Sequence, residues 1–465
     1  MSARILFIVY DNDSYIHWFP QGVGYLAAVL KNAGFEVTIY NQDYHHYPDS
    51  HLTEYLNKNV FDFIGFSFIA GYYQYKKAVA ISNAINASDK RPYYIIGGHG
   101  PSPEPEYFLK KTGADAVVIG EGEKTIVDLL NSKINKKGIE KVEGIAYLNS
   151  SGQYVINKKR SLIEDIDAIP FPAYELFPVH YYRLLRMPHC ANSDFVMPLL
   201  SGRGCTFTCN FCYRMDKGFR PRSSYGIIEE IEFLKKKYGI TYIAFSDELL
   251  MSSLSRIEEI CNAFIKSKIN IKWDCNGRLN YAKPDILRLM KRAGCVFINY
   301  GIEALDDHVL RKMGKGLTVR QIEEGIKATL DSGISPGFNI IFGHIGDNKK
   351  ILQKGVDFLL KYDDGAQLRT IRPVTPYPGS PLYYYAIEIG LLQGCEDFYE
   401  NKHLNSDLMA VNFTDLTDSQ YYQSLYAANL QLLENYFNKK SKIVQQQMQQ
   451  LYHKRDTAFR GFRQS

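Results

Sequence analysis

Three cysteines in one short segment are the most chemically informative feature of this 465-residue chain. They are Cys205, Cys209 and Cys212, within the run Cys-Thr-Phe-Thr-Cys-Asn-Phe-Cys, so their thiols lie on one loop. A structural zinc site normally has four ligands, whereas a [4Fe-4S] cluster held by three thiolates leaves one iron open to a small molecule. The segment therefore predicts an iron–sulfur cluster with an open coordination position.

Zinc is the alternative metal for the same cysteines, with His189 or Cys190 as a fourth ligand, and a chance arrangement is the other alternative. The chain has eight cysteines, and those outside this segment are scattered. In a reducing compartment such a distribution favours metal binding or chemistry over a disulfide framework.

The cysteine loop needs elements that position it, and these follow from hydrophobic periodicity. Residues 138–193 are rich in proline and aromatic residues, which suits a connector better than a helix or a central strand. Strand and helix patterns then alternate over residues 194–390 and predict a partial (β/α)6 barrel, whose working face lies at the carboxyl ends of its strands. The six strands are expected to begin near Val196 and to follow at residues 242–245, 271–276, 297–302, 337–342 and 366–373. Residues 391–465 are polar and predict a C-terminal helical region.

An earlier α/β domain is predicted over residues 1–137, where short apolar runs alternate with amphipathic stretches. The pattern is typical of a doubly wound, flavodoxin-like sheet, in which ligands bind beyond the carboxyl ends of the strands. Its strands are expected at residues 5–10, 36–41, 61–67, 93–97 and 116–120, and its helices at residues 22–33, 75–87 and 123–131. The candidate ligand contacts at these strand ends are Ser67, Gly97, Gly98, Glu121 and Gly122.

The cysteine segment, with Phe211 before its third cysteine, resembles the CxxxCxΦC signature of the radical S-adenosylmethionine (SAM) superfamily. The resemblance implies that the open iron binds the amino and carboxylate groups of SAM and that Phe211 packs near the adenine. It also implies SAM contacts at the ends of later barrel strands, where acidic side chains suit an ammonium group. The candidates for these contacts are Asp247, Glu248, Asn276, Arg278 and Glu303.

Structural roles are the alternatives for these residues, since Asp247 or Glu248 could cap the next helix and Arg278 could form an ion pair. The segment Thr375-Pro-Tyr-Pro-Gly-Ser-Pro381 resembles one found in a branch of the superfamily. The turn Gly343-His-Ile-Gly-Asp347 departs from the family, because many relatives have a Gly-Phe-Pro-Gly-Glu-like sequence there. A cofactor contact at that turn is therefore not predicted.

A dinucleotide-binding role for the first domain is an alternative, because Gly22, Gly24 and Ala27 fit a GxGxxA pattern. In a dinucleotide fold, however, the glycine turn follows the first strand at once, so that the pyrophosphate reaches the helix N-terminus. About eleven residues separate Tyr10 from Gly22 here, which argues against this function.

The first domain instead resembles the cobalamin-binding domain of a large radical SAM subfamily. The resemblance rests on the segments 20–34, 97–100 and 113–123, and with the barrel it covers about residues 1–390. Small residues at the strand ends let the backbone approach a large flat corrin. The DxHxxG element that supplies a cobalt ligand is absent, since Asp13 and His17 have the wrong spacing, and neither His17 nor His99 is assigned to cobalt.

Together these resemblances imply a cobalamin-dependent radical SAM enzyme with a [4Fe-4S] cluster, SAM and cobalamin as cofactors. We expect a C-methyltransferase in which a 5′-deoxyadenosyl radical activates an unactivated substrate carbon and methylcobalamin supplies the methyl group. A cyclase or oxidase of the anaerobic porphyrin-cyclase type is the first alternative. A non-catalytic cobalamin- or metal-binding regulator is the second.

The composition of the chain limits the kinds of partner that we expect it to bind. The net charge of +5 is mild, and its basic excess gathers in residues 438–465, which favours a solvated helix over a nucleic-acid groove. No apolar run approaches the ~18 residues of a membrane span, and the chain opens on a strand-like run rather than a signal peptide. We therefore expect a cytoplasmic protein with a small-molecule or peptide substrate and an electron donor such as flavodoxin or ferredoxin.

Overall fold

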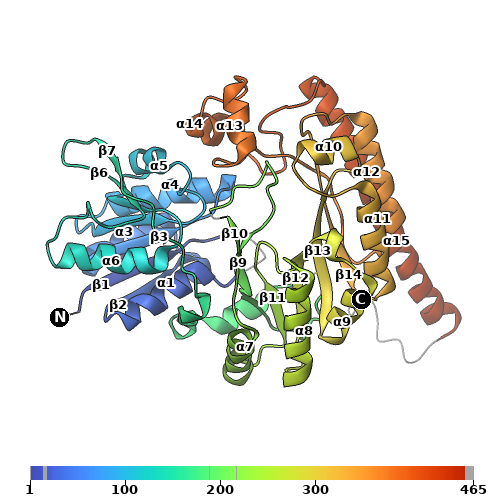
Figure 1. The fold of residues 1–465 in the computed structure, drawn as a ribbon, viewed down its shortest axis with the longest axis horizontal. Coiled ribbons are helices and arrows are strands. Elements are labelled where there is room, and N and C mark those ends of the chain that lie inside the picture. The colour runs from blue at the N-terminus through green and yellow to red at the C-terminus, as the bar shows by residue number, and fades with distance from the viewer. Residues whose placement is uncertain (1, 14–17, 188, 216, 456–465) are drawn as a thin grey trace.

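The computed structural model describes residues 2–13, 18–187, 189–215 and 217–455, so His17 lies outside the described residues. Two sheets with their helices stand side by side, the first domain on the left of Figure 1 and the barrel on the right. None of the helices in this described part has the length and apolar character needed to cross a lipid bilayer.

The first sheet has the strand order β2-β1-β3-β4-β5 and is parallel throughout these five strands. They are β1 (Arg4–Val9), β2 (Glu36–Asn41), β3 (Phe63–Ser67), β4 (Tyr93–Gly97) and β5 (Ala116–Val118). The accompanying helices are α1 (Gln21–Asn32), α2 (Gln42–His45), α3 (Asp49–Lys58), α4 (Tyr72–Asn86), α5 (Pro105–Thr112) and α6 (Gly122–Ile134). The flavodoxin-like fold is confirmed, with nearly continuous apolar strands, as expected of a sheet covered on both faces.

The sheet continues past residue 137, where the sequence predicted a connector. A hairpin of β6 (Ile145–Leu148) and β7 (Tyr154–Ile156) adds to β5 in antiparallel orientation. These strands are only four and three residues long, too short for a clear alternating pattern. The rest of the segment contains short 3₁₀ helices, η1 (Ile166–Ala168), η2 (Tyr174–Leu176) and η3 (Val179–Leu184).

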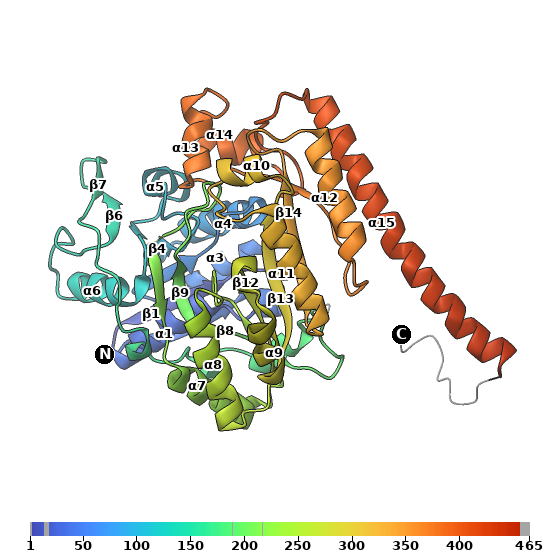
Figure 2. The ribbon, with the colours of Figure 1, turned by 45° about the vertical axis from the view of Figure 1, so that its right-hand side comes forward.

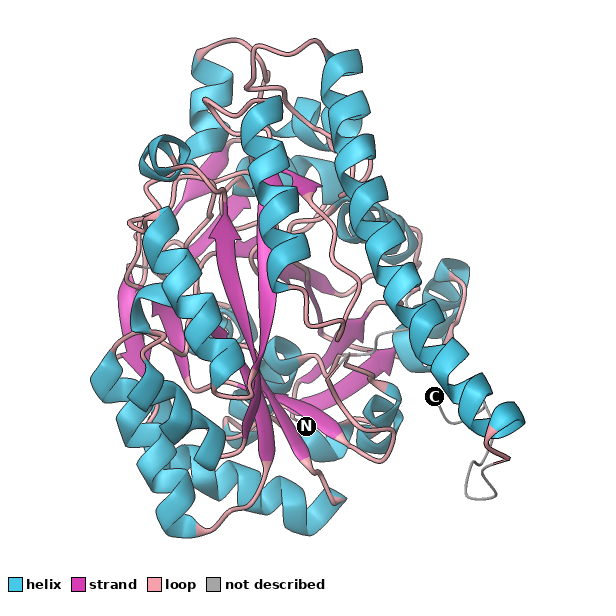
Figure 3. Ribbon diagram, turned by 90° about the vertical axis from the view of Figure 1, so that its right-hand side faces the viewer, coloured by secondary structure: helices cyan, strands magenta, loops and turns pink. Residues whose placement is uncertain are grey.

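The second sheet is an open six-stranded parallel sheet with the order β15-β14-β13-β12-β11-β8, which confirms the partial barrel. Its strands are β8 (Val196–Leu199), β11 (Tyr242–Phe245), β12 (Lys272–Gly277), β13 (Cys295–Glu303), β14 (Ser335–Phe342) and β15 (Arg372–Pro373). Its helices are α7 (Ser224–Tyr238), α8 (Leu254–Ser267), α9 (Pro284–Arg292), α10 (Asp307–Lys312), α11 (Val319–Asp331) and α12 (Lys349–Tyr362), with the short η4 (Leu279–Tyr281). Figure 3 shows how helices enclose the strands.

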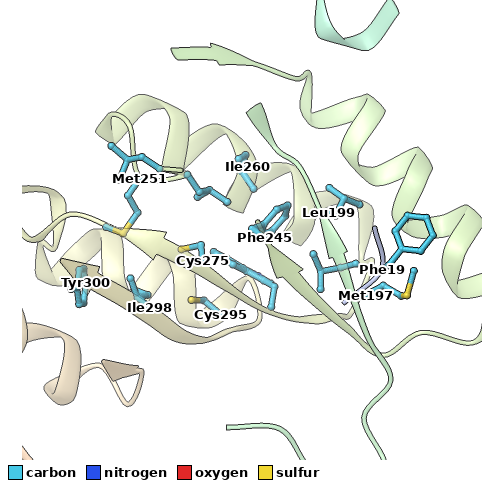
Figure 4. Packing of buried hydrophobic residues seen from close by; sticks show 14 of the residues in the cluster. Phe19, Met197, Leu199, Phe245, Met251, Ile260, Cys275, Cys295, Ile298 and Tyr300 are labelled. Atoms are coloured by element: carbon cyan, nitrogen blue, oxygen red, sulfur yellow. The ribbon is translucent and has the colours of Figure 1, made fainter. Parts of the chain in front are cut away.

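Side-chain packing in the barrel core holds the strands, and therefore their carboxyl ends, in fixed positions. In Figure 4 Phe245, Cys275 and Ile298 pack together between the sheet and its helices. Trp273 is fully buried in the same core, and its indole Nε1 donates a hydrogen bond of 2.8 Å to the Ala293 carbonyl. Substituting such a side chain by alanine typically costs about 3–5 kcal/mol.

A short antiparallel hairpin of β9 (Gly202–Cys205) and β10 (Gly218–Pro221) carries the first cysteine of the cluster segment. The C-terminal region then adds α13 (Pro381–Glu388), α14 (Cys395–Asp397), η5 (Phe398–Lys402), α15 (Asp418–Met448) and η6 (Gln449–His453). Tyr383, Phe398 and Tyr399 pack into the core beside α4 and α5 of the first domain. The start of α15 packs on α12, and its far end projects from the body in Figure 2.

Candidate active site

The carboxyl ends of the two sheets border two neighbouring cavities. The first, of about 290 Å³, lies between the edge of the first sheet and the β9–β10 hairpin, and we call it the N-domain cavity. The second, of about 710 Å³, lies at the strand ends of the barrel and is called the barrel cavity. His99 and Glu248 line both cavities, with His99 Nε2 3.9 Å from Glu248 Oε1. The two strand-end sites that the sequence predicted are therefore neighbours.

All three cluster cysteines line the barrel cavity. A hydrogen bond between Cys209 and Cys212, together with the nearby charges of Lys315 and Arg278, lowers the pKa of the Cys209 thiol to about 6. The same hydrogen bond raises the pKa of Cys212, while burial raises the pKa of Cys205. Because the thiolate is the metal-binding form, the cationic neighbours of Cys209 favour ligation there.

The donor set, three cysteine thiols, is of the kind that holds a [4Fe-4S] cluster with one open iron. In the described residues, no three His, Cys, Asp or Glu side chains converge on one metal position. Each thiolate of a [4Fe-4S] cluster binds a different iron, so its ligands need to surround a volume rather than meet at a point. The three cysteines lie on one loop at the wall of a cavity, and the hydrogen-bonded thiols of Cys209 and Cys212 would have to separate to bind two different irons.

A buried ion pair stands beside the cysteines. Glu303 Oε1 accepts a hydrogen bond of 2.8 Å from Lys315 Nζ, and both side chains are buried. Glu303 has a φ of +69° where β13 shifts register, and Gly301 leaves space for the pair because a Cβ there would lie 2.7 Å from Lys315 Nζ. Strained backbone of this kind clusters at functional sites. The pair lines the barrel cavity, where the sequence predicted Glu303 to be.

Arg278 and Phe211 also line the barrel cavity. The guanidinium carbon of Arg278 lies 3.4 Å from the centroid of the Phe207 ring, and its Nη2 donates to the Lys315 carbonyl. Burial lowers the pKa of Arg278, and the neighbouring Cys209 and Cys205 oppose this shift. Arg278 therefore holds a positive charge against the cysteine loop rather than forming a distant structural ion pair.

A row of amides crosses three adjacent strands at the floor of the barrel cavity. Asn339 Nδ2 donates to Asn299 Oδ1 at 2.9 Å, and Asn299 Nδ2 donates to Asn276 Oδ1 at 3.0 Å. Asn276 Nδ2 in turn donates to the Asp247 carbonyl at 2.8 Å. We call Asn276, Asn299 and Asn339 the amide row. Of these three residues only Asn276 was predicted from the sequence, although polar residues inside the apolar strands β13 and β14 are a detectable signal.

Asp247 does not line either cavity, unlike its neighbour Glu248. Its carboxylate accepts hydrogen bonds from the Ser201 backbone N–H, at 2.6 Å, and from the Ser201 hydroxyl. Burial raises the pKa of Asp247 to about 6. Its position does not support the predicted SAM contact, because the carboxylate is occupied in joining the ends of β8 and β11.

The N-domain cavity is bordered by Ser67, Gly97, Gly98 and Gly122 and is lined mainly by apolar groups. Gly98 has a φ of +97°, and a Cβ there would lie 2.7 Å from the Phe68 carbonyl oxygen. Only glycine fits this position. The small residues and apolar lining suit one face of a flat corrin. A cavity of this volume encloses part of so large a molecule, and the adjoining barrel cavity offers further space.

Glu121 lies at the N-domain cavity, but its carboxylate is already occupied. It accepts hydrogen bonds from Arg203 at 2.8 Å, from Arg220 at 3.0 Å and from the Ile163 backbone at 2.8 Å. Burial raises the pKa of Glu121, but these hydrogen bonds outweigh it and hold the pKa below its ordinary value. Arg203 also pairs with Glu123 at 2.5 Å. Glu121 thus ties the β9–β10 hairpin to the first domain, and this set of ion pairs is called the hairpin clamp.

Two family models match the chain. The radical SAM superfamily model matches residues 199–359, and the B12 binding domain model matches residues 9–130. The chain belongs to the cobalamin-binding radical SAM superfamily. These matched ranges contain the cysteine loop with the barrel cavity and the glycine-rich edge of the first sheet, respectively.

Several known proteins are similar to this radical SAM chain. An uncharacterized methyltransferase of Pyrococcus horikoshii is 28% identical over 80% of the chain and 79% of its own length. An anaerobic magnesium-protoporphyrin IX monomethyl ester cyclase of Rubrivivax gelatinosus is 26% identical over 79% of the chain, which spans 66% of the cyclase. The structure of the radical SAM methyltransferase TsrM from Kitasatospora setae superposes with a TM-score of 0.72 at 17% identity, covering 93% of this chain and 89% of TsrM. The superposition on TsrM supports the fold described above.

Proposed function

We propose that this chain is a cobalamin-dependent radical SAM C-methyltransferase that acts on an unactivated carbon of a small-molecule or peptide substrate. The observation that carries the proposal is the junction of the two cavities at His99 and Glu248. A transferred methyl group has to pass between the corrin site and the substrate, and cavities that share two lining residues place these two sites next to each other. The similarity to the methyltransferase of Pyrococcus horikoshii supports the same reaction type.

The residues that would bind the cluster, cobalamin and SAM form three groups. Cys205, Cys209 and Cys212 would hold the cluster, and the small residues at the edge of the N-domain cavity, Ser67, Gly97, Gly98 and Gly122, would admit the cobalamin. The SAM contacts would come from Phe211, Glu248, Asn276, Arg278 and Glu303, joined by Asn299 and Asn339. When bound, the cluster and SAM supply a radical that removes hydrogen from the substrate, and methylated cobalamin supplies the methyl group.

The protein contributes positioning and exclusion of water. Glu248 presents a carboxylate to the barrel cavity, suited to the ammonium of SAM. The amide row offers fixed donors and acceptors along its floor, since each amide is oriented by its neighbour. Lys315 and Arg278 place positive charge near the cysteine loop, which favours its thiolates.

Ring formation or oxidation is the second candidate function, because the chain is similar to an anaerobic porphyrin-ring cyclase over most of its own length. Both reactions would use the same two cavities. The electron donor and the cytoplasmic location stay predictions.

An isotope experiment tests the proposal without a known substrate. The protein is reconstituted anaerobically with iron, sulfide and cobalamin, reduced, and given SAM with a deuterated methyl group. We expect deuterated methylcobalamin and S-adenosylhomocysteine in equal amounts. Cobalamin that binds but takes up no deuterium would contradict methyl transfer and favour the cyclase alternative.

The cysteine variants control for the radical function. Cys205→Ala, Cys209→Ala and Cys212→Ala should abolish the visible iron–sulfur absorption and the reductive cleavage of SAM to 5′-deoxyadenosine. A protein that binds only zinc after reconstitution would exclude the radical reaction altogether.

A further inference from the structure

Asn210 stands between two of the cluster cysteines, and all of its polar groups are engaged. Its backbone N–H donates to the Met313 carbonyl at 2.9 Å, and its Nδ2 donates to the Lys312 carbonyl at 3.0 Å. Its own carbonyl accepts from the Leu382 N–H at 2.8 Å. Asn210 therefore attaches the cysteine loop to the end of α10 and to the start of α13.

The side-chain oxygen of Asn210 has a different partner, His344, which belongs to the turn that departs from the family pattern. His344 Nε2 lies 2.9 Å from Asn210 Oδ1. Because Asn210 Nδ2 already donates to Lys312, Oδ1 is the acceptor and His344 Nε2 carries the proton. The His344 side chain is fully buried, so the donor end of this hydrogen bond is shielded from water.

The turn around His344 is itself held in shape. Asp347 Oδ2 accepts from the Gly343 N–H at 3.0 Å and from the His344 N–H at 3.2 Å. Gly343 has a φ of +96°, and Tyr421 of α15 donates a hydrogen bond of 2.7 Å to the preceding Phe342 carbonyl. The imidazole is thus aimed at Asn210 by a structured turn at the end of β14.

We propose that His344 is a positioning residue for the cluster, acting through Asn210 to hold the Cys209–Cys212 half of the loop in its ligating conformation. Asn210 is the direct neighbour of Cys209 and lies two residues before Cys212, so a change in its orientation moves both thiols. The turn Gly343-His-Ile-Gly-Asp347 then has a function in this chain: it supports the iron–sulfur loop rather than contacting SAM.

This inference rests on the cluster that the proposed function assigns to the three cysteines. Two variants separate positioning from folding. His344→Leu removes the donor and leaves Asn210 Oδ1 without its partner, and Asn210→Ala removes the acceptor. His344→Gln keeps a nitrogen donor of similar reach and serves as the rescue variant.

His403→Phe is the matched control, because His403 is also a fully buried histidine and lies among Tyr72, Tyr377 and Phe398. No bond to the cysteine loop is present among the described contacts of His403. A loss seen with both histidine variants would reflect general loosening of the fold, whereas a loss specific to His344 would not.

The readouts are the rate of iron loss to a chelator and the electron paramagnetic resonance spectrum of the reduced cluster with and without SAM. Since residues that orient metal ligands typically contribute about 10–100-fold to affinity, we expect His344→Leu and Asn210→Ala to lose iron about tenfold faster and to show a weaker SAM-induced spectral change. His344→Gln should recover most of the difference.

The outcomes are distinguishable. If the wild-type protein forms no cluster, the proposed function fails and this inference fails with it. If the wild-type protein forms a SAM-responsive cluster and His344→Leu and Asn210→Ala match it in both readouts, only the positioning role is overturned. If His344→Leu does not fold, Asn210→Ala and His344→Gln decide the question by the same two readouts.

Discussion

The strand-end edges of the two sheets differ in the groups that they offer to a ligand. At the N-domain cavity the carboxyl ends of the strands carry glycines, and the lining is formed by exposed backbone and apolar side chains. At the barrel cavity the corresponding ends carry asparagines, charged residues and the cysteine loop, joined by hydrogen bonds. One edge makes room for a large flat molecule, and the other fixes individual groups. We therefore expect ligand binding at the first edge to be weakened by substitutions that add atoms. Ligand binding at the second edge should be weakened by substitutions that remove side-chain groups.

Removing one cluster ligand should have the largest effect. We expect Cys209→Ala to abolish the iron–sulfur absorption and all SAM cleavage, because two remaining thiolates cannot hold the cluster. Iron analysis and product chromatography measure the two losses. Cys190→Ala is the matched control and should retain both, whereas equal loss in Cys190→Ala would favour the zinc alternative.

Adding a single methyl group at Gly98 should disrupt the other edge. The new Cβ in Gly98→Ala would meet the Phe68 carbonyl at 2.7 Å in a backbone with φ of +97°. Such strain costs about 1–3 kcal/mol of folding stability. Because the backbone has to shift to relieve the contact, the edge that faces cobalamin is displaced, and we expect cobalamin affinity to fall by roughly tenfold or more. Equilibrium titration followed by visible absorption measures it.

Gly34→Ala controls for the backbone strain alone, because Gly34 has a φ of +88° with nothing near its Cβ position. We expect it to destabilise the protein without changing cobalamin affinity. Equal loss of affinity in Gly34→Ala and Gly98→Ala would show that the glycine edge has no special relation to the corrin.

Breaking the hairpin clamp should weaken the connection between the two edges. Arg203→Met leaves Glu121 and Glu123 without one of their cations in a largely buried setting. We expect a loss of about 2 kcal/mol in the free energy of unfolding, less than for a fully buried pair because Arg203 is partly exposed. Urea denaturation measures this loss, and Glu123→Gln added to Arg203→Met should recover part of it. Strict additivity of the two changes would contradict the clamp.

The smallest expected effect is on the pH dependence of folding stability. It comes from His403 in the C-terminal region, which covers both domains. Burial lowers the pKa of His403 to about 4, below its ordinary 6.5. As pH falls below 6.5 the unfolded histidine takes up a proton and the folded one does not, so folding stability is lost between pH 6.5 and 4. Between pH 7 and 5.5 this amounts to about 1 kcal/mol. His403→Phe should lack that part of the pH dependence in urea denaturation, and a variant as acid-sensitive as wild type would contradict it.

Much of this architecture could be predicted because it depends on local periodicity. The strands of both sheets follow apolar runs, and the cysteine spacing is a property of one segment. The amide row could not be predicted in full, since Asn299 and Asn339 meet Asn276 only through strand register. The same holds for Glu121 and Asp247, whose carboxylates were expected to face ligands. Their partners, Arg203, Arg220 and Ser201, lie 46 to 99 residues away in the chain.

The β9–β10 hairpin was also missed, for a related physical reason. Its strands are four residues each and contain glycine, cysteine and arginine in place of an apolar alternation. Its stability comes from pairing around the cysteine loop and from the hairpin clamp rather than from its own core. Elements of this kind are specified by contacts distant in sequence.

The central claim is that cobalamin and the iron–sulfur cluster occupy adjoining cavities, and magnetic coupling tests it most directly. Protein loaded with both cofactors is reduced so that the cluster and cobalt are each paramagnetic, and its electron paramagnetic resonance spectrum is compared with those of protein carrying one cofactor at a time. The adjoining cavities predict broadened, mutually coupled signals from the doubly loaded protein. A spectrum equal to the sum of the two separate spectra would contradict the account.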